Sequence, residues 1–447
     1  MTFSAASLAE HLEEFEQLAG KPSRYVIAFS GGLDSTVLLH ALAELKKSDP
    51  RYGNTPVLAI HIDHGLQSES HQWRDACELT AADYEIEFRS LRVTVAMDSG
   101  KGTEASARDA RYAALHAELH SEDWLLSAHH RDDQAETLLL NLIRGSGPAG
   151  VAGIGDVRRF GPGWLVRPML NVDRKDILQY ATSGGLRWVE DPSNTDHRFD
   201  RNFLRHEILP RLASRWPDIA VRLQRSAGHA GEASQLLIDL AEIDLKGLGS
   251  RSARLPIDGL AALSKARQRN VIRYALRDRG LSTPTAAQLE RVLDEIIPAR
   301  VDEQPLVSWS GASVRRYRNR LYLLAPDMSE VIESAAISGM EHELGVGLGL
   351  LRLEPGADLG LSPALLDDGL MIRPRMGGEE FQPFGQAHTR KVKKLLQEEG
   401  VVPWMRDRLP LLYAGERLIA VGDLWLADDA VTRPGVAVRW IGRPALH

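Results

Sequence analysis

The residues Ser30-Gly31-Gly32-Leu33-Asp34-Ser35-Thr36 combine glycines, hydroxyl groups and one carboxylate in a single short turn. They follow the apolar run Tyr25–Phe29 and precede a helical pattern, so a helix N-terminus with free backbone N–H groups is expected there. Glycines let the backbone approach a phosphate closely, and the hydroxyl groups add hydrogen-bond donors. A carboxylate beside phosphates requires a cation between them, so Asp34 points to Mg²⁺. The turn therefore predicts a phosphate site with a metal ion.

A second group of charged residues lies in Ala128–Thr137, which contains Asp132, Asp133 and Glu136. Spacings of three and four residues bring these carboxylates onto neighbouring positions of one helix surface. They could hold Mg²⁺ or bind an ammonium group, whereas acids in a first helical turn also complement the helix dipole without any further role. Because two histidines directly precede them, we favour a functional site.

The first part of the chain, about 215 residues, alternates short apolar runs with helical patterns, as in βαβ units. This alternation predicts an α/β, doubly wound parallel sheet, whose ligands bind beyond the carboxyl ends of the strands. Polar residues follow three expected strands, at Ser30–Ser35, Asp63–Gly65 and Ala128–His130, so they should line one cleft. The expected strands are Tyr25–Phe29, Val57–Asp63, Phe88–Val95 and Trp124–Ala128, and the expected helices are Ser35–Lys46, Ser70–Tyr84, Thr103–His120 and Asp132–Ile143.

The length of 447 residues favours about three domains. We expect a catalytic α/β domain at 1–217, a mainly helical, basic central domain at 218–330 and a small α+β domain at 340–447. The net charge is −7, but basic side chains cluster in Arg198–Arg225, Arg251–Arg279 and Arg315–Arg320. Local basic surfaces attract phosphate backbones, although solvated helix faces would have the same composition.

Composition excludes several classes of protein. The only cysteine is Cys77, so intrachain disulfides and a two-cysteine sulfur relay cannot form. The N-terminus is rich in glutamate and lacks the cationic start of a signal peptide. No apolar run approaches the ~18 residues that span a bilayer. These features predict a cytoplasmic protein without a membrane partner.

Longer motifs resemble those of a known family. SGGLDST, HIDHGL, ARDARY (Ala107–Tyr112) and AHHRDDQAETLLLNLIRGSG (Ala128–Gly147) occur in the order typical of tRNA(Ile)-lysidine synthases, which belong to the ATP pyrophosphatases with an SGGxDS PP-loop. The resemblance continues through RPML, WVEDPSN and RNFLRHEILP to KVKKLLQEEGVVPWMRDRLPLL (Lys391–Leu412). It covers nearly the whole chain, although Asp218–Pro326 matches only in general character and Pro148–Ile154 departs slightly from the expected glycine spacing.

The resemblance implies ATP-dependent attachment of free lysine to C2 of the wobble cytidine in the CAU anticodon of an isoleucine tRNA, through an adenylated cytidine. ATP would bind at Ser30, Gly31, Gly32, Leu33, Asp34 and Ser35, and Asp34 and Asp132 would hold Mg²⁺. Asp133 and Glu136 would bind the lysine ammonium, and one of them would accept its proton. Arg108, Arg111 and His129 would stabilise the α-phosphate. The basic domains would bind the tRNA, and a homodimer is compatible with the resemblance.

Three alternatives stay open. A tRNA thiolase uses the same adenylation step but delivers sulfur, which a single cysteine does not support. A small-molecule ATP pyrophosphatase would not need the basic C-terminal domains. A non-catalytic RNA-binding relative would not need the intact acids Asp34, Asp132, Asp133 and Glu136.

Overall fold

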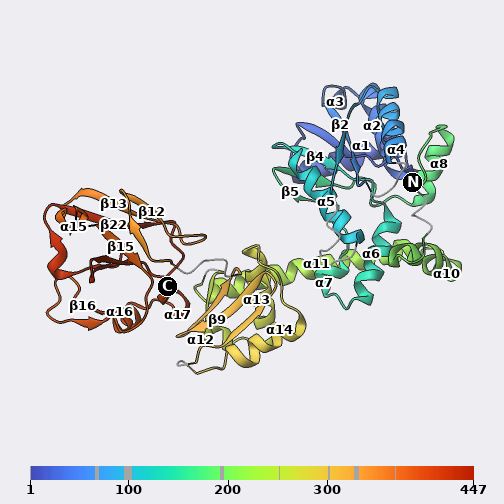
Figure 1. Ribbon diagram of the computed structural model, residues 1–447. Helices are drawn as coiled ribbons and strands as arrows, with labels where there is room; N and C mark the ends of the chain where they lie inside the picture. Colours follow the sequence, from blue (N-terminus) through green and yellow to red (C-terminus); the bar gives the residue numbers. More distant parts are fainter. Residues whose placement is uncertain are drawn as a thin grey trace. The chain divides into compact units, whose positions relative to one another are not determined.

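The computed structural model describes residues 2–65, 70–94, 103–191, 196–250, 252–300, 303–326, 332–367 and 369–446. These residues form two compact units, Met1–Leu237 and Ile238–His447 (Figure 1). Four parts of the predicted elements and motifs lie outside the described residues: Leu66, Val95, Pro192–Asn194 and Arg251.

The first unit is built on a six-stranded sheet with the order β3-β2-β1-β4-β6-β5. All neighbouring pairs are parallel except β5 and β6, which are antiparallel. This arrangement confirms the predicted doubly wound α/β fold, and it places the carboxyl ends of β2, β1 and β4 side by side. The strands are β1 (Arg24–Ala28), β2 (Val57–Asp63), β3 (Glu87–Arg92), β4 (Asp123–Leu126), β5 (Val157–Phe160) and β6 (Gly163–Val166).

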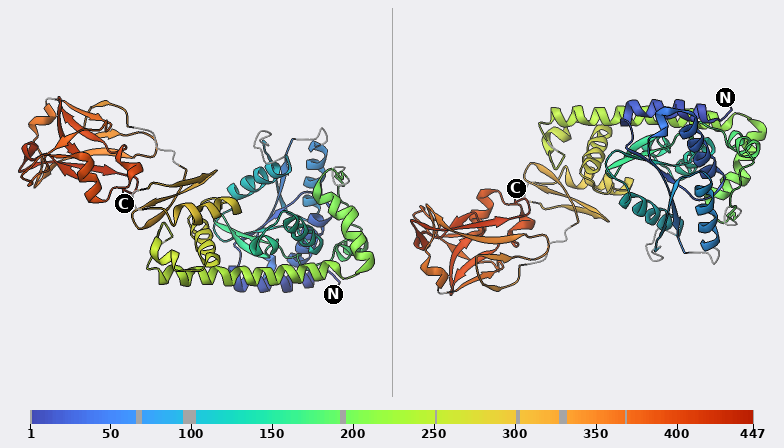
Figure 2. Two further views of the ribbon diagram at one scale, coloured as in Figure 1. Left: turned by 90° about the horizontal axis from the view of Figure 1, so that it is seen from below. Right: turned by 90° about the horizontal axis from the view of Figure 1, so that it is seen from above.

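Helices cover both faces of this sheet (Figure 2). Because side chains alternate along a strand, Tyr25 and Ile27 pack into a core with α1, α2, α4 and α8, whereas Val26 packs against α5 on the other face. The helices of this unit are α1 (Ala5–Ala19), α2 (Leu33–Ser48), α3 (Pro50–Gly53), α4 (Ser70–Asp83), α5 (Thr103–Ala117), α6 (Arg131–Ile143), α7 (Pro148–Val151), α8 (Arg174–Ser183), α9 (Asp200–Phe203), the π-helix η2 (Leu204–Ile208) and α10 (Leu209–Arg215). Helix α11 (Ile219–Gly247) runs on into the second unit.

The second unit begins with helices and a four-stranded antiparallel sheet of order β7-β10-β9-β8. The central region, predicted to be mainly helical, thus also contains a four-stranded sheet. These elements are β7 (Arg254–Pro256), α12 (Ile257–Ala261), α13 (Lys265–Asp278), α14 (Ala286–Arg291), the π-helix η3 (Val292–Ile296), β8 (Leu306–Trp309), β9 (Ala312–Tyr317) and β10 (Arg320–Leu324).

Two antiparallel sheets, of order β11-β15-β18-β19-β20 and β12-β13-β22-β14-β21, form the C-terminal part together with a two-stranded ribbon. Helix α16 (Val392–Glu399) is the longest helix among the described residues of this part, and α15 (Ala364–Asp367) and α17 (Pro403–Arg406) are single turns. None of the helices among the described residues combines the length and apolar character needed to cross a bilayer. The strands are β11 (Ala335–Ile337), β12 (Glu341–Glu343), β13 (Leu350–Ala357), β14 (Gly360–Leu361), β15 (Leu370–Arg373), β16 (Glu380–Phe381), β17 (Arg390–Lys391), β18 (Leu411–Ala414), β19 (Arg417–Val421), β20 (Trp425–Leu426), β21 (Val431–Thr432) and β22 (Gly435–Ile441), with the 3₁₀ turn η4 (Asp428–Ala430).

Candidate active site

The glycine turn between β1 and α2 can be formed only with glycine at position 31. Gly31 has φ +79°, and a Cβ atom there would lie 2.6 Å from Sγ of Cys77. The left-handed backbone and the sulfur beneath it both exclude a side chain. The backbone of the turn therefore packs directly on the buried Cys77 at the carboxyl end of β1.

Hydroxyl groups fix the shape of this turn. Ser30 Oγ and Ser35 Oγ lie 3.1 Å apart, and Ser35 Oγ donates to the carbonyl of Gly32 at 3.1 Å. Gly32 precedes α2 without any side chain to cap it, and Leu33 is buried in the core, so these residues can offer only backbone groups. A helix start without a side-chain cap presents its first N–H groups to an anion.

Asp34 in the first turn of α2 carries an unsatisfied oxygen atom. Its Oδ1 is buried and has no hydrogen-bond partner, while Oδ2 lies 3.7 Å from Nε2 of His130. Burial raises the pKa of Asp34, and His130 partly opposes that shift. A buried carboxylate oxygen without a partner fits a cation ligand.

His130 links Asp34 to the acids of α6. Its Nε2 lies 3.5 Å from Oδ2 of Asp133, and its backbone N–H donates to the same oxygen at 3.0 Å. The structure thus brings the glycine turn and the acidic helix together, although they are separated by about a hundred residues in the sequence.

Two arginines that the sequence analysis did not assign to the site bind Glu136. The carboxylate of Glu136 is fully buried, and it accepts hydrogen bonds from Nε of Arg201 at 2.7 Å and Nε of Arg205 at 2.6 Å. Arg205 Nη2 also donates to Oδ1 of Asp133 at 3.0 Å. Both arginines belong to the basic stretch Arg198–Arg225, for which RNA binding is predicted. Their spacing of four residues places them on one face of a helix, and this pattern could have indicated that they bind the same partner.

These contacts change what the acids can do. Burial alone would raise the pKa of Asp133, but His130, His129, Arg201 and Arg205 together hold it well below its usual range. Glu136 has both oxygens engaged by arginine. A lowered pKa makes Asp133 a weak proton acceptor, and the general-base role of Asp133 or Glu136 stays a prediction.

Asp132 has a different environment. Within the described part of the chain its carboxylate has no ion-pair partner, and burial together with Asp173, Glu136 and Asp133 raises its pKa against the opposing effect of His130. No three His, Cys, Asp or Glu side chains among the described residues are grouped closely enough to hold a metal ion. Mg²⁺ usually takes one or two carboxylates and completes its shell with phosphate and water. Asp34 fits that pattern best.

His129 lies beside Asp133, and Arg111 of α5 is close enough to affect the pKa of His129. Ser127 Oγ and Nδ1 of His129 are 2.6 Å apart, and burial lowers the pKa of His129 to about 3, with Arg167, Arg201 and Arg111 acting in the same direction against Asp133. The imidazole is therefore neutral near pH 7. Arg108 is exposed, and its guanidinium lies 5.6 Å from the ring centroid of Tyr112.

Curated proteins similar to this chain carry one name. The tRNA(Ile)-lysidine synthase of Alkalilimnicola ehrlichii is 42% identical over 442 residues, covering 97% of this chain and 96% of the relative. The enzyme of the same name from Methylococcus capsulatus is 40% identical over 437 residues, covering 96% and 99%. This chain belongs to the tRNA(Ile)-lysidine synthase family. The resemblance inferred from the motifs is confirmed.

Family models match three parts of the chain. A PP-loop domain matches residues 4–212, a TilS substrate binding domain matches 255–322 and a TilS substrate C-terminal domain matches 370–440. The site described above lies within the first of these. The domain boundaries at 217, 330 and 340 remain predictions.

Two solved structures match about half of this chain at low similarity. The U34-tRNA thiolase NcsA from Methanococcus maripaludis has a TM-score of 0.40 and 19% identity, covering 50% of this chain and 79% of that one. The NAD+ synthetase from Burkholderia pseudomallei has a TM-score of 0.30 and 14% identity, covering 52% and 90%. In this lysidine synthase family member, Cys77 is fully buried and its pKa is raised to about 12 by burial, so it is unsuited to sulfur transfer.

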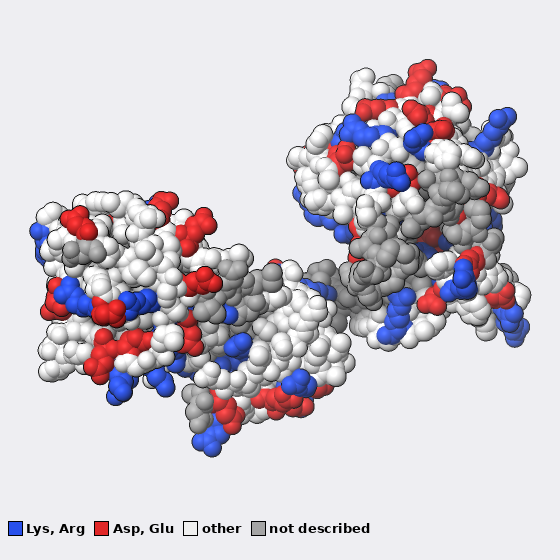
Figure 3. Space-filling view, in the orientation of Figure 1, with Lys and Arg blue, Asp and Glu red and all other residues white. Residues whose placement is uncertain are grey.

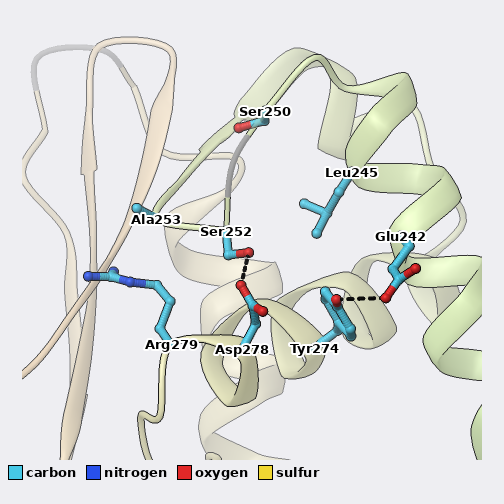
Figure 4. A pocket seen from close by; sticks show the side chains of 8 residues that line it. All are labelled: Glu242, Leu245, Ser250, Ser252, Ala253, Tyr274, Asp278 and Arg279. Atoms are coloured by element: carbon cyan, nitrogen blue, oxygen red, sulfur yellow. Dashed lines mark hydrogen bonds between the residues drawn. The ribbon is translucent and has the colours of Figure 1, made fainter.

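A pocket of about 460 Å³ in the second unit contains none of the predicted site residues. Tyr274 donates to Glu242 and Ser252 donates to Asp278 across it, as Figure 4 shows. Its lining consists of Glu242, Leu245, Ser250, Ser252, Ala253, Tyr274, Asp278 and Arg279.

Proposed function

We propose that this chain joins the ε-amino group of free lysine to C2 of the wobble cytidine in the CAU anticodon of an isoleucine tRNA. Membership of the family supports ATP-dependent lysidine formation in tRNA(Ile), with ATP bound by the PP-loop domain. The observation that supports the site assignment is the position of His130 between Asp34 and Asp133. It brings the glycine turn next to the acidic start of α6.

In the first step, the cytosine carbonyl oxygen attacks the α-phosphorus of ATP and pyrophosphate leaves. The N–H groups at the start of α2 and the hydroxyls of Ser30 and Ser35 would bind the departing pyrophosphate. Asp34 would hold Mg²⁺ through its unpartnered Oδ1, and the ion would neutralise phosphate charge. Arg111 and the neutral His129 would donate to the α-phosphate, with Arg108 nearby on α5.

In the second step, the lysine ε-amine attacks C2 and AMP leaves with the former carbonyl oxygen. At pH 7 only about one amine in a few thousand is uncharged, given a pKa near 10.4. The negative charge of Asp132 and Asp133 would attract the lysine ammonium.

Asp132 is our candidate for the proton acceptor. Burial raises the pKa of Asp132, and among the described residues its carboxylate is not paired with arginine. Glu136 would instead position α6 through the two arginines, and Asp133 would bind the ammonium with the oxygen that faces His130. This distribution assigns one task to each carboxylate.

The tRNA must present its wobble base unstacked, which limits substrates to a single-stranded loop. On the face shown in Figure 3, acidic and basic side chains are interspersed over both units, so no single basic surface there dominates. Lys391, Lys393 and Lys394 near α16 are exposed and would contact tRNA phosphates. The cytoplasmic location and the homodimer stay predictions.

A labelling experiment tests the proposal. The full chain is incubated with ATP, Mg²⁺, radiolabelled lysine and a transcript of isoleucine tRNA with a CAU anticodon. We expect label in the RNA and one pyrophosphate released per lysine, and no label when the wobble cytidine is replaced by uridine. Binding of the transcript without any incorporation would support the non-catalytic alternative instead.

A further inference from the structure

An exposed row of aromatic rings lies on the helical segment that carries Arg201 and Arg205. Phe199 is 39% exposed and Phe203 is 45% exposed, and the N–H of Phe203 bonds to the carbonyl of Phe199 at 3.0 Å. Phe203 and His206 are three residues apart in the helical segment, and Phe199 immediately precedes that segment. His206 is exposed there, and the ring of His197 stacks on it with centroids 5.5 Å apart and planes at 2°. We call Phe199, Phe203, His197 and His206 the aromatic strip.

The opposite side of the same segment faces the acids of α6. Arg201 and Arg205 project toward α6, where they bind Glu136 and Asp133. A ligand bound to the aromatic strip would therefore contact the same short helical segment that binds Glu136 and Asp133. Two buried ion pairs restrict how far that turn can move.

Apolar side chains and paired arginines surround the strip. Helix α6 packs against α9, and its last residues, Leu142 and Ile143, are 51% and 75% exposed. The next residue, Arg144, lies 4.0 Å from Asp200, beside Phe199. Arg198 is paired with Asp196 at the surface. Exposed ion pairs of this kind are weak, so phosphates can replace the aspartates.

We propose that the aromatic strip stacks the unpaired nucleotides next to the wobble cytidine in the anticodon loop. Exposed rings flanked by arginine are the features that bind single-stranded RNA, because every base has a face that stacks and every linkage a phosphate. This inference rests on the proposed function. It assigns the loop contact to an element that also positions the catalytic carboxylates.

The test uses an anticodon stem-loop in which 2-aminopurine replaces the adenosine of the CAU triplet. We expect its fluorescence to fall on binding to the wild-type chain, because stacking quenches it. Phe199→Ala with Phe203→Ala should abolish the quenching and raise Kd about ten-fold or more. The double Tyr variant should retain both properties, and Leu178→Ala, at a 45% exposed residue of α8, should change neither.

Two outcomes would overturn the inference. In the first, the double Ala variant still quenches the 2-aminopurine fluorescence and binds the stem-loop with a Kd within about two-fold of wild type. In the second, the double Ala variant changes the oligomeric state of the protein but neither the quenching nor the Kd. The second would make the strip an interface between copies of the chain. If the double Ala variant fails to fold, the double Leu variant replaces it, since it keeps apolar bulk but lacks rings. If the wild-type chain does not incorporate lysine into the tRNA, the proposed function is refuted. The stem-loop binding assay does not depend on turnover, so the two failures can be distinguished.

Discussion

Nε of Arg205 donates a hydrogen bond of 2.6 Å to Oε1 of Glu136, a residue 69 positions earlier in the chain. Arg201 binds the other oxygen, so a fully buried carboxylate is neutralised by two partly exposed guanidinium groups. The segment from Asp200 to Arg215 is thereby fastened to α6. This contact gives Glu136 a positioning role that its sequence motif alone does not reveal.

Glu136→Gln should destabilise the first unit by about 3 kcal/mol, because two arginines would lose their buried counter-ion. Urea unfolding at pH 7 measures the loss. The control is Glu207→Gln, which breaks a surface pair with Arg211 and should cost less than about 1 kcal/mol. Equal effects of the two substitutions would contradict the importance of the buried contact.

Asp34→Asn should reduce lysine-dependent pyrophosphate release by about a hundred-fold or more, since a charged ligand at the phosphates is lost. The same substitution should increase the stability of the folded protein, although it lowers activity. The pKa of Asp34 is raised by burial, so the ionised group opposes folding above the unfolded-state pKa, and the amide should raise the unfolding midpoint at pH 7. Wild-type turnover in this variant would remove the turn from the ATP site.

Asp132→Asn should lower kcat by about a hundred-fold while the KM for lysine changes little, because proton transfer is lost and binding is not. Asp132→Glu should restore part of the rate. A pH–rate profile adds a second readout, since the acid limb of kcat should disappear in the Asn variant. An increase in the KM for lysine without a change in kcat would identify Asp132 as an ammonium ligand instead.

Gly31→Ala should cost about 3 kcal/mol or more, the sum of a left-handed alanine and a clash with Cys77. Gly185→Ala is the matched control, since Gly185 has φ +61° and open space around its Cβ position, so only the backbone contribution of about 1–2 kcal/mol applies. Thermal unfolding of both variants separates the two costs. Similar losses would show that Cys77 moves aside freely.

The stability of the first unit should depend on His129 below pH 6.5. Its folded-state pKa is about 3, whereas a free histidine titrates near 6.5. The unfolded chain therefore binds the additional proton between these values, and the free energy of unfolding falls as the pH drops below 6.5. His129→Gln should flatten this dependence by at most about 1.4 kcal/mol per pH unit, measured by urea unfolding at pH 5–7. His71→Gln, at an exposed position of α4, should leave the dependence unchanged.

Local patterns in the sequence were sufficient to predict several features of the first unit. Strand β2 has the predicted bounds, and α6 begins one residue earlier than expected. Hydrophobic periodicity and helix-start residues depend on neighbours in the chain, so they can be read without coordinates. The glycine turn and the acid cluster were found for the same reason, and the parallel order of β2, β1 and β4 explains why they meet.

Only the tertiary structure could show which charges neutralise one another. Arg201 and Arg205 were equally consistent with RNA binding until folding placed them against Glu136 and Asp133. Among the described residues, Asp132 is the acid of α6 that has no arginine partner. Cys77, far from Gly31 in the chain, lies where a Cβ atom of residue 31 would be. Such contacts form only when packing brings two distant segments within a few ångströms of each other. Residue type and spacing along the chain therefore do not determine them.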